Sequence, residues 1–107
     1  MPKSRRKKVR PKLPPVHPGQ VLKTVLGDAG ITANALALAL RIPANRLTEI
    51  INQKRSISAD TALRLAQYFG TSAQLWMNLQ AKFDLESAED ALADRIKSEV
   101  QPMRKAS

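Results

Sequence analysis

The sequence predicts an all-α fold, a compact domain of five to six helices with a helix-turn-helix at its centre. Apolar residues make up 43% of the 107 residues, which suffices for one modest core but not for two domains. Only four residues are aromatic, so that core must be built mainly from Leu, Ile, Val and Ala. These residues recur at three- and four-residue spacing between caps and glycines, which is the period of a helix.

Residues 1–17 are predicted to form a disordered basic arm. The segment holds seven Lys or Arg, no acid and four prolines, and it has too little apolar surface to fold. Since the whole chain carries a formal charge of +9, residues 18–107 carry only +2. A basic arm attracts nucleic-acid phosphates, acidic proteins and anionic membrane surfaces alike, so charge alone does not choose among these partners.

The first helix is expected over residues 18–26. Pro18 suits a first helical turn, and Gly27 and Gly30 end the run. Its inner face carries apolar residues at helical spacing, namely Val21, Leu22, Val25 and Leu26.

A helix-turn-helix is expected over residues 32–53. Thr32 is a suitable N-cap for a short helix, Arg41 and Ile42 form a tight turn, and Pro43 opens a second helix that extends to Gln53. The inner faces of these two helices must pack together, and they consist of Leu36, Ala37, Leu40, Leu47, Ile50 and Ile51. The outer face of the second helix then projects from the domain, as in proteins that place a helix in the DNA major groove.

The remaining helices are expected after residue 57. One begins at Ser58 or Asp60 and ends at Gly70, and the next begins in a capping box over residues 71–74. A separate terminal helix is expected beyond Asp84, with Pro102 stopping it. The predicted divisions are therefore the arm (1–17), the helix-turn-helix domain (18–84), and a C-terminal helix and tail (85–107).

The predicted base-reading residues lie on the outer face of the helix over residues 43–53. Arg46 has the donors to bond guanine O6 and N7, and Asn45 or Asn52 has the amide to pair with adenine. Glu49 disfavours this interpretation slightly, because a carboxylate repels phosphate unless it accepts from cytosine or orients Arg46. The full predicted set is Ala44, Asn45, Arg46, Thr48, Glu49 and Asn52.

A second predicted set holds backbone phosphates and flanks the first. It combines basic residues, hydroxyls and the amides that open the helix near Thr61. Its members are Thr32, Asn34, Lys54, Arg55, Ser56 and Thr61. The alternative to a DNA-binding surface is a plain αα-hairpin in a bundle, whose polar outer face is ordinary solvated surface.

The chain also offers a candidate dimer surface. One side of the helix after residue 74 carries more apolar area than a peripheral helix leaves in water, through Leu75, Trp76, Leu79 and Phe83. The alternative is that Trp76 completes the core. Catalysis is not expected, because the chain has no Cys, a single His and no carboxylate pair in an apolar setting. No cofactor or metal is expected either.

Three segments carry a resemblance to a known family. They are His17-Pro18-Gly19, Ile51-Asn52-Gln53-Lys54-Arg55, and residues 71–85 with Leu75-Trp76-Met77-Asn78-Leu79-Gln80 before Phe83-Asp84-Leu85. Together they resemble the HigA-type antitoxins of the phage-repressor-like (XRE) helix-turn-helix proteins. The resemblance implies a homodimer that binds a double-stranded operator near its own promoter, represses it, and neutralises a partner toxin, an mRNA-cleaving ribonuclease.

The chain departs from that family's pattern at four positions. Gln20 stands where an acid is usual, and Arg41 and Gln53 stand where glycines are usual. If φ is positive there, each costs ~1 kcal/mol or somewhat more. Ala33 replaces a glutamine that often contacts DNA, and Asn34 is the candidate substitute.

Two other functions remain open at this stage. One is a stand-alone repressor of the same fold without a toxin, and the other is an RNA-binding or nucleoid-associated protein that uses the basic arm. No apolar run approaches the ~18 residues of a membrane helix, and the basic N-terminus lacks the apolar stretch of a secretory signal. A cytoplasmic location without membrane contact is therefore expected.

Overall fold

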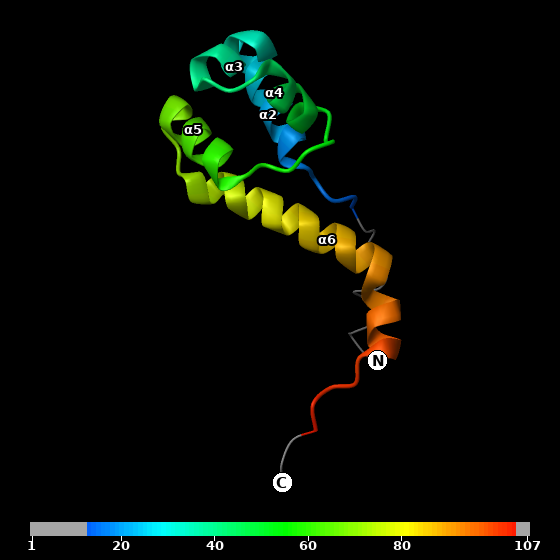
Figure 1. The fold of residues 1–107 in the computed structure, drawn as a ribbon. Helices are drawn as coiled ribbons and strands as arrows, with labels where there is room; N and C mark the ends of the chain where they lie inside the picture. Colours follow the sequence, from blue (N-terminus) through cyan, green and yellow to red (C-terminus); the bar gives the residue numbers. More distant parts are fainter. Residues whose placement is uncertain (1–12, 105–107) are drawn as a thin grey trace, which may run out of the picture.

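The computed structural model describes residues 13–104, which form five helices and no strand (Figure 1). Residues 1–12, most of the predicted arm, lie outside the described part. The helices are α2 (Pro18–Ala29), α3 (Ala33–Leu40), α4 (Ala44–Ile51), α5 (Ala59–Phe69) and α6 (Ala73–Glu99). The predicted all-α, helix-turn-helix fold is confirmed.

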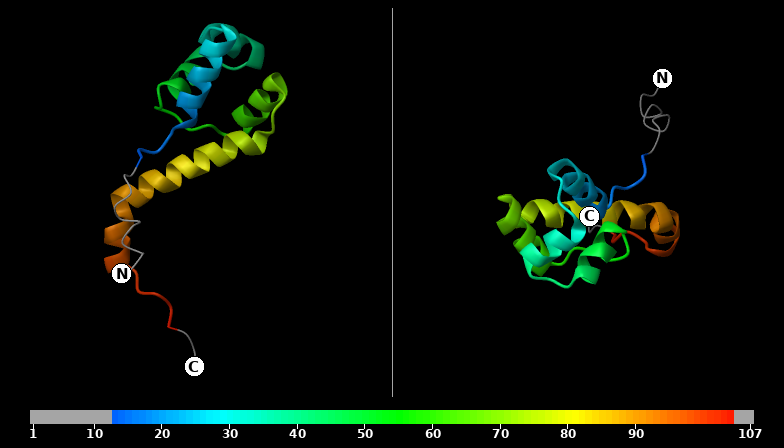
Figure 2. Two further views of the ribbon diagram at one scale, coloured as in Figure 1. Left: turned by 180° about the vertical axis from the view of Figure 1, so that it is seen from behind. Right: turned by 90° about the horizontal axis from the view of Figure 1, so that it is seen from above.

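The core lies where α2 to α5 meet the first half of α6. Figure 2 shows the four shorter helices gathered on one side of α6, while the second half of α6 runs away from them. The inner-face residues predicted for α2 to α4 supply most of this core. Its buried members are Leu22, Leu26, Leu36, Ala37, Leu40, Ile42, Leu47, Ile50, Ile57, Ala62, Leu65 and Trp76.

His17 begins α2 and does not belong to the arm in which it was predicted. The side chain is only 2% exposed, and its Nδ1 accepts the amide hydrogen of Gly19 at 2.8 Å. Gln20 completes a capping box, because its Oε1 accepts from the backbone N–H of His17 at 3.3 Å. The usual acid at position 20 is thus replaced by an amide that serves the same cap.

The other helix starts follow local capping chemistry. Thr32, Ser58 and Ser72 each accept a backbone N–H three residues on through their hydroxyls. Pro43 is the N-cap of α4 and not its first helical residue, and α4 ends at Ile51. The recognition helix is therefore shorter than the predicted span of residues 43–53.

One continuous helix replaces the two that were expected after residue 70. The segment 73–99 contains neither glycine nor proline, so nothing in it ends a helix. Asp84, the expected break, accepts a hydrogen bond from Gln80 Nε2 at 2.9 Å within the helix. The predicted boundary between residues 84 and 85 falls inside α6, and the helix starts from Ser72 rather than from Thr71.

Trp76 belongs to the core and does not line a dimer surface. It is 3% exposed, and its Nε1 donates to the hydroxyl of Thr71 at 3.2 Å. Leu79 is half-buried against the same core, and Phe83 packs edge-on against His17, with ring centroids 4.7 Å apart. Of the four predicted dimer residues, only Leu75, at 44% exposure, is classed as exposed.

Within residues 13–104, no single helix is long and apolar enough to cross a membrane. The α2 and α3 helices pass that test only as a pair bent by 103°.

Candidate nucleic-acid interface

The turn between α3 and α4 is closed by backbone hydrogen bonds at Arg41. This residue takes the left-handed conformation, with φ of 59°, and the N–H of Ile42 bonds the carbonyl of Ala37 at 3.1 Å. A glycine adopts this conformation without strain, so the chain accepts a cost of ~1 kcal/mol at Arg41. The condition stated for such a cost, a positive φ at Arg41, is therefore met.

A second left-handed residue ends the recognition helix. Gln53 has φ of 63°, and the N–H of Lys54 bonds the carbonyl of Glu49 at 2.8 Å. This arrangement closes α4 and turns the chain sharply. Lys54, Arg55 and Ser56 follow it as an exposed loop.

The α4 helix is held from behind by two neighbours. Leu47 and Ile50 are fully buried against α2 and α3. The backbone of α2 comes so close to the end of α4 that only glycine fits at position 19, because a Cβ there would overlap the Ile50 carbonyl. The outer face of α4 is consequently rigidly supported, as a groove-reading helix requires.

Four of the six predicted base-reading residues are exposed without a partner side chain in the described structure. They are Ala44, Asn45, Thr48 and Asn52. The hydroxyl of Thr48 donates to the carbonyl of Ala44 at 3.0 Å, which leaves the oxygen and the methyl group available to a ligand.

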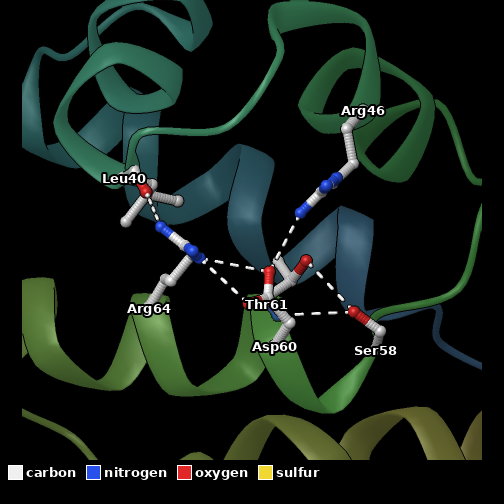
Figure 3. A network of polar contacts seen from close by, with 6 residues as sticks. All are labelled: Leu40, Arg46, Ser58, Asp60, Thr61 and Arg64. Atoms are coloured by element: carbon white, nitrogen blue, oxygen red, sulfur yellow. Dashed lines mark hydrogen bonds and ion pairs between the residues drawn. The ribbon is translucent and has the colours of Figure 1, made fainter.

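The other two predicted base-reading residues form ion pairs. Glu49 accepts from Arg55 at 2.7 Å, so this carboxylate orients Arg55 and not Arg46. Arg46 Nη1 donates to Asp60 Oδ2 at 3.0 Å, across the gap between α4 and α5 (Figure 3). Each acid on this face thus has a basic partner, which lowers its repulsion of phosphate.

Asp60 lies at the centre of a wider network. Arg64 Nε donates to both oxygens of the Asp60 carboxylate, at 3.2 and 3.1 Å, and Arg64 Nη1 donates to the Leu40 carbonyl at 2.9 Å (Figure 3). The hydrogen bond from Arg64, with a smaller contribution from Arg46, lowers the pKa of Asp60 below its ordinary value. The carboxylate is therefore ionised at neutral pH.

These side chains line an open polar recess of about 440 Å³ beside α4. The lining includes three arginines and two serine hydroxyls, which are donors suited to a phosphate oxygen. The full lining is Arg46, Arg55, Ser56, Ser58, Asp60, Thr61 and Arg64.

The predicted phosphate-binding residues divide into two groups. Thr32, Asn34, Lys54, Arg55 and Ser56 are exposed. Thr61 is fully buried, and its backbone N–H donates to Ser58 Oγ at 3.3 Å. The Thr61 amide is therefore used by the N-cap of α5 and is not available to an anion. The predicted phosphate contact at Thr61 is wrong.

Asp60 and Arg64 were absent from the predicted site. Their four-residue spacing at the start of a helix is a local signal for an ion pair, but the contact to Arg46 joins residues fourteen positions apart. No group of three or more His, Cys, Asp or Glu side chains among the described residues is placed to hold a metal ion.

The fold and this surface define a helix-turn-helix domain of the DNA-binding type. A family model described as helix-turn-helix matches residues 22–76. Virulence-associated protein I of Dichelobacter nodosus is 47% identical over 78 residues, which is 72% of each chain.

Two solved structures match most of this chain. One is an addiction module antidote protein of a HigA family from Coxiella burnetii, with a TM-score of 0.82 and 47% identity over 85% of this chain and 100% of that one. The other is the Pseudomonas aeruginosa antitoxin HigA with the higBA promoter, with a TM-score of 0.81 and 43% identity over 84% of this chain and 99% of that one. The chain belongs to the helix-turn-helix family and, within it, to the HigA-type branch.

Proposed function

We propose that this protein is an antitoxin that binds double-stranded operator DNA near its own promoter and represses it. The observation that carries the proposal is the outer face of α4, which is polar, exposed and supported from behind by α2 and α3. The related HigA from P. aeruginosa, which was solved with the higBA promoter, supports binding to promoter DNA. The proposed protein binds operator DNA in the cytoplasm and has no enzymatic activity.

The residues divide into two roles. Ala44, Asn45, Arg46, Thr48, Glu49 and Asn52 read or shape contacts with the bases. Thr32, Asn34, Lys54, Arg55 and Ser56 hold phosphates. Base contacts set the preferred sequence, whereas phosphate contacts set affinity and its dependence on salt.

The test compares Arg46→Ala with Lys54→Ala on two duplexes of equal length, one from the region upstream of the gene and one shuffled. Arg46→Ala is expected to reduce the preference for the upstream duplex. Lys54→Ala is expected to weaken both complexes evenly and to flatten the salt slope by about one unit. An unchanged preference in Arg46→Ala would remove its assigned role.

The protein is proposed to act as a homodimer through the exposed half of α6. Leu85, Leu92 and Ile96 lie on one face of this helix, at 63, 38 and 49% exposure, and no described residue covers them. A two-fold dimer then requires half-sites ~10 base pairs, or a multiple, apart, which footprinting measures.

The partner proposed for neutralisation is an mRNA-cleaving toxin encoded beside this gene. Co-expression with the neighbouring product, followed by co-purification and a growth assay, tests this part separately. If no neighbouring product is toxic or binds, the protein is a stand-alone repressor, while its operator binding is unaffected.

A further inference from the structure

The carboxylate of Asp60 is held from the side opposite Arg46. Arg64 contacts both of its oxygens, and the same guanidinium is bonded to the last carbonyl of α3 at Leu40 (Figure 3). The orientation of the carboxylate is therefore tied to the backbone of the helix-turn-helix. A lone surface aspartate has no such restraint.

Arg46 reaches this fixed carboxylate with a single nitrogen. Nη1 donates to Oδ2 at 3.0 Å, and no other hydrogen bond from the Arg46 guanidinium is found among residues 13–104. The side chain keeps 31% of its surface exposed. One donor group is thus occupied, and the remaining donors are available for a ligand beside α4.

The network also controls charge at the recess. The two guanidinium groups and one carboxylate of the network have a net charge of +1, and removal of the carboxylate leaves two like charges near each other. Without the ion pair, the Arg46 side chain is free to rotate about several bonds and can contact any nearby phosphate.

We propose that Asp60 is a positioning residue for operator recognition, which fixes the Arg46 guanidinium so that its free donors meet one base. The inference rests on the proposed DNA-binding function and deepens it. Asp60 itself makes no contact with DNA in this scheme, and its carboxylate lowers non-specific attraction to phosphate while Arg46 supplies discrimination.

The test is Asp60→Asn in the full-length protein, which keeps the side-chain size and removes the charge. Fluorescence anisotropy gives dissociation constants for the upstream duplex and for the shuffled duplex. The dissociation constant for the shuffled duplex divided by that for the upstream duplex measures discrimination. We expect this ratio to fall about 3- to 10-fold, with the shuffled duplex bound as tightly as before or more tightly. Asp28→Asn, the same charge change at an exposed position near the end of α2, is expected to leave the ratio unchanged.

A double-mutant cycle separates positioning from a structural role. In the Arg46→Ala background, Asp60→Asn is expected to leave the ratio unchanged within about twofold, because the residue acts through Arg46. An equal fall in both backgrounds, or an unchanged or increased ratio in the single variant, would overturn the inference. If the wild-type protein shows no preference for the upstream duplex, the proposed function itself fails.

Discussion

Gly19 is the glycine at which an added methyl group should lower the free energy of unfolding most. It lies in the first turn of α2, where the backbone of that helix meets the end of α4. A Cβ built on Gly19 overlaps the carbonyl oxygen of Ile50 and lies 2.9 Å from the carbonyl carbon. The obstacle is backbone and cannot rotate away, so Gly19→Ala must push α2 from α4.

The expected cost is at the upper end for an overpacked core, ~3 kcal/mol of unfolding free energy. For a domain of this size that corresponds to a melting temperature lower by ~12 °C. Gly27→Ala is the matched control, since nothing lies within 4 Å of a Cβ at that position in the same helix. Removal of a flexible glycine there should stabilise by ~0.5–1 kcal/mol and raise the melting temperature by a few degrees.

Thermal unfolding followed by circular dichroism measures both variants. If Gly19→Ala melts within about 2 °C of the wild type, the close approach of α2 to α4 is not a constraint, and the account of how α4 is supported is wrong. A loss of stability in Gly27→Ala would show instead that alanine destabilises α2 even where a Cβ has free space, and Gly19→Ala would then not report on the contact with Ile50.

The remaining predictions concern the turn, the cap, the dimer and the arm. Arg41→Gly should raise the free energy of unfolding by ~0.5–1 kcal/mol in urea titrations, and no gain would contradict strain at φ of 59°. Burial lowers the pKa of His17 below 6.5. The contribution of this neutral side chain to the stability of the folded state is therefore complete above pH 6.5 and is lost as pH falls towards the folded-state pKa. Since this is the only histidine, His17→Asn should flatten melting temperature against pH in that window. Leu92→Glu should convert a dimer into a monomer by light scattering, with Asp94→Asn as control. Deletion of residues 1–13 should weaken DNA binding and reduce its salt slope while sequence preference survives, and loss of all preference would contradict the role of α4.

Local sequence rules predicted most of the fold. Helical spacing identified the buried faces of α2 to α4, because one core covers one face of each helix. Side-chain caps at Thr32 and Ser58 were also predictable, because a cap depends on neighbouring residues alone. The left-handed conformations of Arg41 and Gln53 were suggested only by the resemblance to a family that usually has glycines there.

The break expected after Asp84 was a local error, because residues 73–99 contain no glycine or proline to end a helix. The placements of Trp76 and Gln80, by contrast, depend on contacts between distant segments. Whether Trp76 lies in the core or on the surface depends on the packing of α6 against the other helices, and helical spacing gives only its face. The buried Gln80 is similar, since its partner is the backbone N–H of Ile57, 23 residues away at 2.7 Å. No local pattern predicts such pairs, which form only once α5 and α6 have packed.

The distribution of charge separates sequence preference from overall affinity. Residues 44–64, which hold the recognition helix and the Asp60 network, contain four basic and two acidic residues, whereas residues 1–12 contain seven basic residues and no acid. In the recognition segment each acid is bonded to an arginine, which restricts the arginines and limits indiscriminate attraction to phosphate. Two variants should therefore change different observables. Truncation of the arm should change the salt-dependent affinity for any duplex, whereas Asp60→Asn should change the ratio of the dissociation constants for the two duplexes.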